Sequence, residues 1–364
     1  MSQKLRVGII GRDLNKKGGG TKTYILNILK SLSGKKYEGH KFYLIHNCLE
    51  YKGHFPSFEE TFIEEKNKLL FDYLYVPIWS RKNKLDIVFY PKSTIPFFVR
   101  GKKIVTVHDL AYFMPSLHAY TLLNTFFMKR MIKSSCKRAD KLIVVSENTK
   151  RDIINILGIN EEKIKVIYEA ADEKYKIMKD KEKLREIKEK YNLSKKFILF
   201  TGGITPRKNL VRLIKTFNKI SNDISHDLVL TGGKGWKNKE ELALIKHNKK
   251  IKRLGFVADE NMPYLYNLAD IFIYPSLYEG FGLPVLETQA CGCPVIASNV
   301  SSIPEVGGDS VLYIDPYNIE DIKEKMLRLA KNESLKKDLI RKGFKNVKRF
   351  SWDKAAKEIL DVIE

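Results

Sequence analysis

Two glutamates, Glu279 and Glu287, enclose a glycine-rich turn whose residue types suit the binding of a phosphorylated, hydroxyl-rich ligand. The segment reads Ile271-Phe-Ile-Tyr-Pro-Ser-Leu-Tyr-Glu-Gly-Phe-Gly-Leu-Pro-Val-Leu-Glu287 and continues Thr288-Gln-Ala-Cys-Gly-Cys-Pro-Val-Ile296. It predicts a strand ending near Tyr274, a loop, and a helix of about two turns that starts near Pro284. Gly292 supplies a left-handed helix end before the next strand.

This turn predicts both an anion site and two hydrogen-bond acceptors. Amides at Leu283 and its neighbours, approachable because of Gly280 and Gly282, would attract a diphosphate. The carboxylates of Glu279 and Glu287 would accept hydrogen bonds from hydroxyls, as on a sugar and a ribose. The alternative is that both glutamates are surface acids beside a tight turn.

A second glycine turn carries two adjacent cations. The segment Phe197-Ile-Leu-Phe-Thr-Gly-Gly-Ile-Thr-Pro-Arg-Lys-Asn209 predicts a strand, a turn and a helix start. Arg207 and Lys208 could neutralise a diphosphate leaving group as its negative charge grows. Alternatively, they are a solvated pair at a helix start.

The first half of the chain offers two further candidates. His108 and Asp109 follow a predicted strand, on the side where open parallel sheets bind ligands, although a histidine there can also be purely structural. The loop from Asn15 to Thr21 contains Gly19 and Gly20 and is expected to open a helix capped by Thr21. It lacks the G-x-G-x-x-G spacing of dinucleotide-binding folds, and a plain surface turn is the alternative.

Apolar runs rich in β-branched residues alternate with helix-length amphipathic segments, which predicts parallel sheets covered by helices. The expected strands are 5–10, 42–46, 87–90, 104–108, 142–145 and 166–168, followed by 197–200, 228–231, 271–274, 295–297 and 311–314. The polar stretch 169–196 separates the two sets and predicts a boundary near Ala171. We expect a first domain over residues 1–171, a second over 172–350, and a last helix within 351–364.

Composition excludes several protein classes. A chain of 364 residues with 43% hydrophobic residues can bury two cores. The four cysteines suit core positions better than disulfides or a zinc site. The opening apolar run is too short for a secretion signal and no stretch is long enough to span a bilayer, so we expect a cytoplasmic protein. The lysines behind the net charge of +23 are spread along the chain, unlike those of a nucleic-acid module.

The segment from Glu279 to Ile296 resembles the signature of the retaining glycosyltransferases of family four, glycosyl transferases group 1. This resemblance implies a GT-B fold, α/β with two Rossmann-like domains facing a central cleft. It assigns Glu279 to the transferred sugar, Glu287 to the donor ribose and Lys208 to the donor phosphates. Further residues would bind the donor or act beside it: His108, Gly19, Gly20, Arg207, Phe256, Val257, Gly280, Phe281, Gly282 and Leu283.

The resemblance leaves two points open at these positions. Many family members have arginine directly after the first glycine of the second motif, where this chain has Gly203. Arg207 would then take over that charge, or the site would hold phosphate less firmly. Phe256 and Val257 would line a nucleobase pocket, or else belong to the ordinary core.

By resemblance, the expected function is retaining transfer of a hexose from a nucleoside-diphosphate sugar to a glycan or lipid-linked acceptor. The Pro-Arg-Lys-Asn variant favours mannose. The family implies no cofactor and no catalytic metal, with the acceptor on the first domain, the donor on the second, and the last helix crossing back to the first. The alternatives are a sugar-nucleotide epimerase of the same fold and a basic nucleic-acid-binding protein, although we expect no nucleic-acid partner.

Residues Leu122–Arg138 predict a helix that carries Lys129, Lys133 and Lys137 beside Phe126 and Phe127. Such a cationic amphipathic helix can lie on an anionic membrane, which would place the protein peripherally at the inner membrane face. The alternative is a helix packed on its own sheet.

Overall fold

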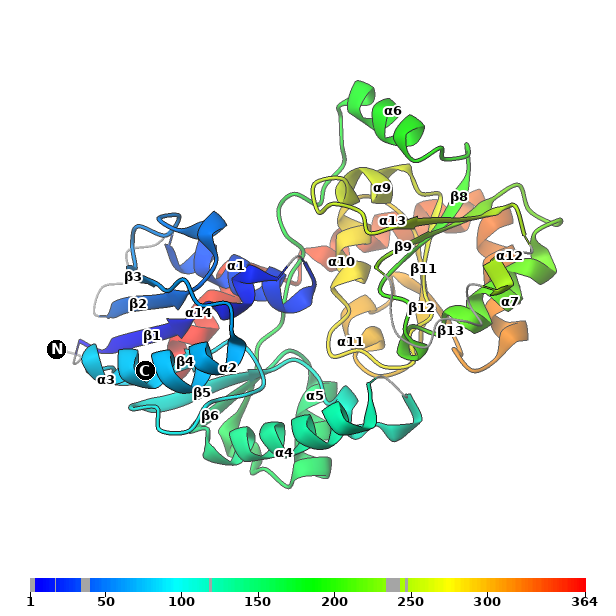
Figure 1. The fold of residues 1–364 in the computed structure, drawn as a ribbon. Coiled ribbons are helices and arrows are strands. Elements are labelled where there is room, and N and C mark those ends of the chain that lie inside the picture. The colour runs from blue at the N-terminus through cyan, green and yellow to red at the C-terminus, as the bar shows by residue number, and fades with distance from the viewer. Residues whose placement is uncertain (1–3, 17, 34–39, 118–119, 234–242, 246–247) are drawn as a thin grey trace. The chain divides into compact units, whose positions relative to one another are not determined.

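The computed structural model describes residues 4–16, 18–33, 40–117, 120–233, 243–245 and 248–364 (Figure 1). The chain forms two compact units. Unit 1 comprises Met1–Phe113, Leu122–Glu169 and Ser351–Glu364, and unit 2 comprises Met114–Thr121 and Ala170–Phe350.

Unit 1 is built on a parallel sheet of seven strands in the order β3-β2-β1-β4-β5-β6-β7. Its strands are β1 (Arg6–Ile10), β2 (Lys41–His46), β3 (Glu59–Phe62), β4 (Ile87–Tyr90), β5 (Lys102–Val107), β6 (Lys141–Val144) and β7 (Ile164–Val166). Its longer helical segments are α1 (Gly20–Ser33), α2 (Lys68–Leu70), the π-helical turn η3 (Phe71–Tyr75), α3 (Val76–Lys82), α4 (Leu122–Arg138), α5 (Glu147–Asp152) and α14 (Trp352–Ile363).

Helices cover both faces of this sheet. Phe71 of η3, Trp79 of α3 and Ile132 of α4 share one buried cluster with Val105 and other strand residues. Thr106 points to the opposite face because strand side chains alternate, and its hydroxyl lies 3.1 Å from that of Tyr24 on α1. On that second face α14 packs against α1, with an edge-to-face contact between Tyr24 and Trp352.

Unit 2 contains a parallel sheet of six strands in the order β10-β9-β8-β11-β12-β13. Its strands are β8 (Phe197–Thr201), β9 (Asp227–Thr231), β10 (Ile251–Gly255), β11 (Ile271–Tyr274), β12 (Val295–Ser298) and β13 (Val311–Ile314). Its helices include α6 (Lys181–Lys190), α7 (Leu210–Ile220), α9 (Met262–Leu268), α10 (Leu283–Ala290), α11 (Ile303–Gly307), α12 (Ile319–Lys331) and α13 (Glu333–Val347). A separate apolar cluster joins α7 and α12 to the strands.

Each sheet reverses its strand order at the centre, between β1 and β4 in unit 1 and between β8 and β11 in unit 2. Open parallel sheets bind ligands beyond the carboxyl ends of the strands at such a reversal. The predicted fold class is confirmed, and every predicted strand is present with ends shifted by three residues at most. The strands predicted from apolar runs did not include β3 and β10. Both are edge strands with mostly partly exposed side chains and no long apolar run.

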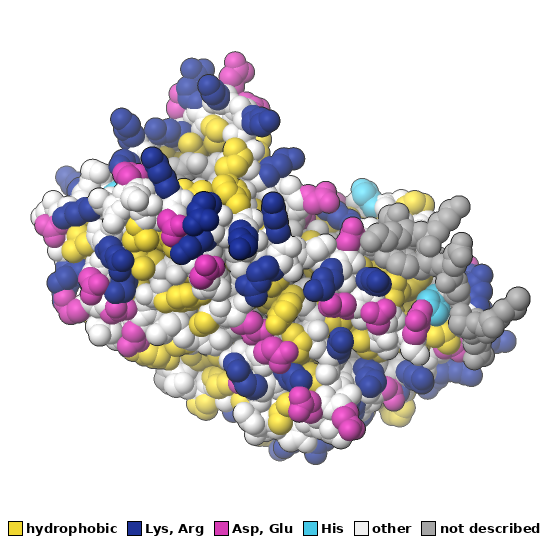
Figure 2. Space-filling model, turned by 180° about the vertical axis from the view of Figure 1, so that it is seen from behind, with side chains coloured by type: hydrophobic (Ala, Val, Ile, Leu, Met, Phe, Trp, Pro, Cys, Tyr) yellow, Lys and Arg dark blue, Asp and Glu magenta, His cyan; other side chains and the backbone are white. Residues whose placement is uncertain are grey.

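Charged side chains are dispersed over the surface. Figure 2 shows Lys and Arg side chains scattered among hydrophobic and acidic ones on the face drawn. In the part of the chain that the structure describes, no helix has both the length and the apolar character needed to cross a membrane.

Candidate functional site

The glycine-rich turn of unit 2 joins the central strand β11 to the eight-residue helix α10, as the sequence predicted. Gly282 is the N-cap of α10 and has φ 112°, a conformation that glycine adopts readily. Glycine has no side chain to cap the helix, and no side-chain cap hydrogen bond is present at its start. Gly292 follows the helix with φ 73°, which confirms the predicted left-handed end.

Arg207, Lys208 and Glu279 meet at the carboxyl ends of β8 and β11. One Arg207 guanidinium nitrogen, Nη1, lies 2.6 Å from Glu279 Oε2, and Lys208 Nζ lies 2.7 Å from Oε1. Lys208 also donates to the Tyr274 hydroxyl at 2.8 Å, and Arg207 donates to the Tyr278 carbonyl at 2.6 Å. The structure thus brings together two separated motifs at the reversal of the sheet.

The two cations keep Glu279 ionised although the side chain is only 9% exposed. Burial raises the pKa of the Glu279 carboxyl, but Arg207 and Lys208 outweigh this effect and lower the pKa to about 2. Because two cations face one carboxylate, the cluster retains one positive charge in excess. Such a cluster can attract a phosphate group and still offer carboxylate oxygens to a hydroxyl.

Two serines fix the loop that carries Glu279. Ser301 Oγ accepts a hydrogen bond from the Glu279 amide at 3.0 Å. Ser302 Oγ lies 3.0 Å from the Glu279 carbonyl and 2.7 Å from the Phe281 carbonyl, to which it donates. On the other side, the Leu277 amide donates to the Arg207 carbonyl at 2.8 Å. This loop is therefore held to both flanking segments before any ligand binds.

Glu287 lies on α10, in a different environment from Glu279 in the preceding loop. Its carboxylate accepts a hydrogen bond from the Tyr266 hydroxyl at 3.2 Å, and the residue is 8% exposed. Burial raises its pKa to about 7, and the hydrogen bond from Tyr266 offsets only part of this effect. Glu287 can therefore change its charge near neutral pH.

The remaining predicted donor residues of unit 2 are placed as follows. Phe281 and Leu283 are buried beside the turn, and Val257 is buried after β10. Phe256 is 60% exposed, so the core alternative fits Val257 but not Phe256. Gly203 adjoins open space, since a Cβ there would contact nothing within 4 Å.

In unit 1, His108 follows β5 and both of its ring nitrogens face acceptors. Nδ1 lies 3.2 Å from Glu169 Oε1, and Nε2 lies 3.1 Å from the Pro91 carbonyl. Burial lowers the pKa of His108, but the Glu169 carboxylate and the Pro91 carbonyl outweigh it and raise the pKa. An imidazolium that donates to both acceptors is the species this geometry favours.

The glycine loop of unit 1 leads into α1, which begins two residues earlier than a cap at Thr21 predicted. Gly19 has φ 101° and Gly20 is the first residue of α1. Thr21 therefore lies inside the helix, and its prediction as the cap was wrong. Its hydroxyl instead accepts a hydrogen bond from Lys16 Nζ at 2.6 Å.

Several contributing residues were not predicted from sequence: Glu169, Tyr266, Tyr274, Ser301 and Ser302. Tyr266 and Glu169 lie 21 and 61 positions from their partners. Tyr274 and Glu169 each follow the rule that the carboxyl end of a strand faces the ligand side, which was the signal available for finding them.

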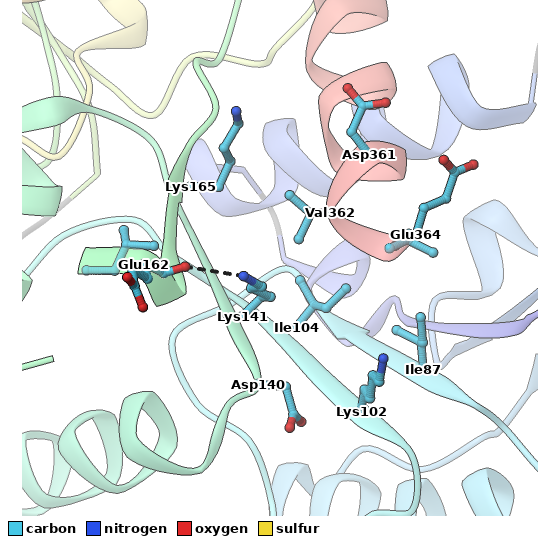
Figure 3. A pocket seen from close by; sticks show the side chains of 12 residues that line it. Ile87, Lys102, Ile104, Asp140, Lys141, Glu162, Lys165, Asp361, Val362 and Glu364 are labelled. Atoms are coloured by element: carbon cyan, nitrogen blue, oxygen red, sulfur yellow. Dashed lines mark hydrogen bonds between the residues drawn. The ribbon is translucent and has the colours of Figure 1, made fainter. Parts of the chain in front are cut away.

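A cavity of about 430 Å³ lies elsewhere in unit 1 (Figure 3). Ile87, Lys102 and Lys141 line it from the amino ends of β4, β5 and β6, together with the last turn of α14. Lys141 donates to the Glu162 carbonyl at 3.2 Å there. The cavity lies at the amino ends of the strands, whereas His108 follows the carboxyl end of β5. None of the predicted site residues line the cavity.

Two family models cover most of the chain. The model of the Glycosyl transferases group 1 matches residues 180–346, and that of Glycosyltransferase Family 4 matches residues 18–175. The group 1 model extends from α6 to α13 and includes Arg207, Lys208 and Glu279.

Characterised relatives include mannosyltransferases. O-antigen chain mannosyltransferase B of Escherichia coli is 29% identical over 78% of this chain and 75% of its own length. An uncharacterized glycosyltransferase of Methanocaldococcus jannaschii is 30% identical over 76% of this chain and 73% of its own. The serotype-specific mannosyltransferase WbdA of Escherichia coli is 28% identical over 73% of this chain, which spans about a third of WbdA.

Solved structures of glycosyltransferases share the fold. Anabaena HepE in complex with UDP and glucose superposes with a TM-score of 0.75 over 99% of both chains, at 16% identity. Sucrose-phosphate synthase from Thermosynechococcus elongatus gives a TM-score of 0.77, covering 99% of this chain and 98% of its own, also at 16% identity.

Proposed function

Because this chain belongs to glycosyltransferase family 4 and is related to O-antigen mannosyltransferases, we propose that it transfers mannose from a nucleoside-diphosphate donor, with retention of anomeric configuration. The acceptor in this proposal is a glycan or a lipid-linked glycan. The observation that carries it is the contact of Arg207 and Lys208 with the ionised Glu279 at the sheet reversal of unit 2.

Each group has a separate task in this mechanism. Arg207 and Lys208 bind the donor diphosphate, where negative charge increases as the bond to the sugar breaks. Glu279 accepts a hydrogen bond from a hydroxyl of the transferred sugar, and Glu287 accepts one from the ribose. The related HepE was solved with UDP and glucose, which supports a nucleotide sugar as the class of donor.

In the proposed reaction the bond from the anomeric carbon to the diphosphate breaks while a bond to the acceptor oxygen forms. The transition state has oxocarbenium character, as glycosyl cleavage generally does. A diphosphate oxygen accepts the acceptor hydroxyl proton, so no protein base is needed. We propose that His108, held by Glu169, acts as a cation in the reaction. We also propose that no metal takes part, so that EDTA leaves the rate unchanged.

The test is transfer by the purified protein from GDP-mannose, with UDP-, ADP- and dTDP-sugars as competing donors, to a mannoside acceptor. The anomeric configuration of the product is read by NMR. Lys208→Ala and Glu279→Gln should each lower the rate by a hundredfold or more, while Lys337→Ala, an exposed lysine of unit 2, should not change it. Equal rates in all proteins would refute the site.

Three other results identify competing functions. An inverted anomer would refute retention alone. An epimerised sugar nucleotide formed without acceptor would indicate the epimerase reaction. Indifference to every sugar nucleotide together with strongly salt-dependent DNA binding would indicate a nucleic-acid-binding protein.

A further inference from the structure

Unit 1 presents large apolar side chains to solvent on three segments, which together we call the apolar face. Folded proteins usually keep such clusters for binding. The most exposed members are Leu122 at 88%, Leu123 at 86% and Phe98 at 80%. The full set is Leu69, Leu70, Tyr73, Leu74 and Ile78 on α2, η3 and α3, Phe97 and Phe98 after β4, and Leu122, Leu123, Phe126 and Phe127 on α4.

The three segments are neighbours. Tyr73 Oη lies 3.8 Å from Met131 Sδ, which joins η3 to α4. Arg138 at the end of α4 donates to the carbonyls of Ile95 and Pro96 at 2.8 and 2.9 Å, and its guanidinium lies 4.2 Å from the Phe97 ring centroid. The opposite sides of η3, α3 and α4 share one buried cluster on the sheet. The helices of this layer thus pack through one side and expose apolar side chains on the other.

The chain segments that carry the apolar face have an almost entirely positive charge. Residues 66–84, 95–103 and 122–138 contain thirteen lysines and arginines and a single acid, Asp72. Asp72 is buried and paired with Lys92 Nζ at 2.7 Å. On α4 the exposed side is apolar in its first two turns and basic from Arg130 to Lys137, and the Arg130 guanidinium lies 4.3 Å from the Phe126 ring centroid.

Phe98 is held outward by a backbone conformation that phenylalanine seldom adopts. Its φ is 63°, in the left-handed region, where a bulky residue is an outlier. Its neighbours Ile95, Pro96 and Val99 are buried. The fold therefore fixes an exposed aromatic ring at the centre of the basic segment 95–103.

We propose that the apolar face docks on the surface of a bilayer containing anionic phospholipid. The leucines and phenylalanines would enter the boundary between headgroups and acyl chains, and the flanking Lys and Arg would contact lipid phosphates. This combination of inserted apolar side chains and surrounding cations matches the two components of interfacial binding. Docking of this kind is independent of glycosyl transfer and can fail or succeed separately from it.

Two other occupants fit the face less well. A second copy of the chain would bring the same basic surfaces together across a symmetric contact, where like charges repel. Nucleic acid would use the cations and aromatic rings, but it would leave Leu69, Leu70, Leu74, Ile78, Leu122 and Leu123 without an apolar partner.

The experiment is flotation of the full chain with vesicles of phosphatidylcholine alone or mixed with equal phosphatidylglycerol, at low and high salt. One variant combines Arg130→Gln, Lys133→Gln and Lys137→Gln. Its matched control removes the same charge from unit 2 through Lys331→Gln, Lys337→Gln and Lys345→Gln. A second variant combines Leu122→Ser, Leu123→Ser and Phe126→Ser, with Leu49→Ser, another exposed leucine, as its control.

We expect binding to the mixed vesicles at low salt, and little binding to phosphatidylcholine alone. Each cation removed from the face should weaken binding about fivefold, and the serine variant should weaken it at least tenfold, while both controls bind like the parent. Circular dichroism should be unchanged because the substituted side chains are exposed. Mannose transfer to a soluble acceptor should persist in all four proteins.

Four results would overturn the proposal. The first is that the parent does not bind mixed vesicles at low salt. The second is that the α4 charge variant and its unit 2 control weaken vesicle binding equally, and the third is that the serine variant binds as well as the parent. The fourth is that the parent forms a dimer in solution and the serine variant does not. Binding of duplex DNA that depends on Arg130, Lys133 and Lys137 but not on Leu122 and Leu123, with no vesicle binding, would assign the face to nucleic acid instead.

Discussion

Glu279 and Glu287 lie eight residues apart, yet the pKa of Glu279 is lowered and that of Glu287 is raised. Both side chains are buried, so burial raises both pKa values. Arg207 and Lys208 reverse this effect for Glu279. At Glu287 the hydrogen bonds from Tyr266 and Tyr175 and the charge of Lys174 offset burial only in part. Pairs of titratable groups with pKa values pushed apart are typical of functional sites.

The raised pKa of Glu287 predicts a stability penalty at neutral pH. Between its ordinary value of 4.5 and about 7, the folded protein keeps a proton that the unfolded chain has released, so stability falls as pH rises through this window. The full loss is about 3 kcal/mol above pH 7. Glu287→Gln should therefore melt at a higher temperature than the parent at pH 8, with little difference at pH 4.5.

The same substitution should weaken donor binding. A hydroxyl of the donor donates to the ionised carboxylate, so parent affinity should increase from pH 6 to pH 8 more steeply than that of Glu287→Gln, as measured by calorimetric titration. Glu260→Gln, an exposed acid of unit 2, is the control. A melting temperature of Glu287→Gln that tracks the parent at every pH would contradict the buried ionisation.

At the scale of elements, the turn between β11 and α10 depends on the backbone freedom of Gly282. Its φ of 112° is costly for any residue with a Cβ, although a Cβ would find space there, since its nearest neighbours are 4.0 Å away. The cost of a substitution would thus be conformational and not steric. This separates it from Gly292, where a Cβ would lie 2.7 Å from Ile177 Cδ1.

Gly282→Ala should lower the free energy of unfolding by about 1 to 2 kcal/mol and raise the Michaelis constant for the donor, because the start of α10 shifts. Gly203→Ala is the matched control: it lies in the other glycine turn, and a Cβ there meets nothing within 4 Å. Urea unfolding and donor kinetics of both variants check this. Equal effects of the two alanines would show that the Gly282 conformation is unimportant.

The sequence predicted elements well and long-range contacts poorly. The strands and α14 could be predicted because apolar β-branched runs and amphipathic periodicity are local features of the sequence. The sequence predicted that Arg207, Lys208 and Glu279 follow strands on the ligand side, but it did not predict the ion pairs between them. The contact of His108 with Glu169 was not predicted, because the two residues lie 61 positions apart. The helical segments α2, η3 and α3 were not predicted either, and so neither was their exposed apolar side.

At the scale of the whole molecule, the two units have separate apolar cores. All the predicted donor residues except Gly19, Gly20 and His108 lie in unit 2. Separate cores allow separate unfolding, and a ligand stabilises the unit that holds it.

Calorimetry should therefore show two transitions, and GDP should move mainly the one that belongs to unit 2, by about 2.7 kcal/mol of stabilisation at a hundred times its dissociation constant. Phe71→Leu and Phe217→Leu, one buried in each core, should lower different transitions and so assign them. A GDP shift confined to the transition lowered by Phe71→Leu would contradict the assignment of the donor to unit 2.

The contact of α14 with α1 has a consequence for biosynthesis. Unit 1 holds both the earliest and the latest residues of this sequence, so a ribosome must translate all of unit 2 before unit 1 can be completed. Until then, α14 does not cover α1, and Tyr24 lacks its contact with Trp352. Unit 2 can therefore fold during translation before α14 completes unit 1. A chain terminated before α14 would expose the apolar surface of α1 that α14 covers, which chaperones and proteases recognise.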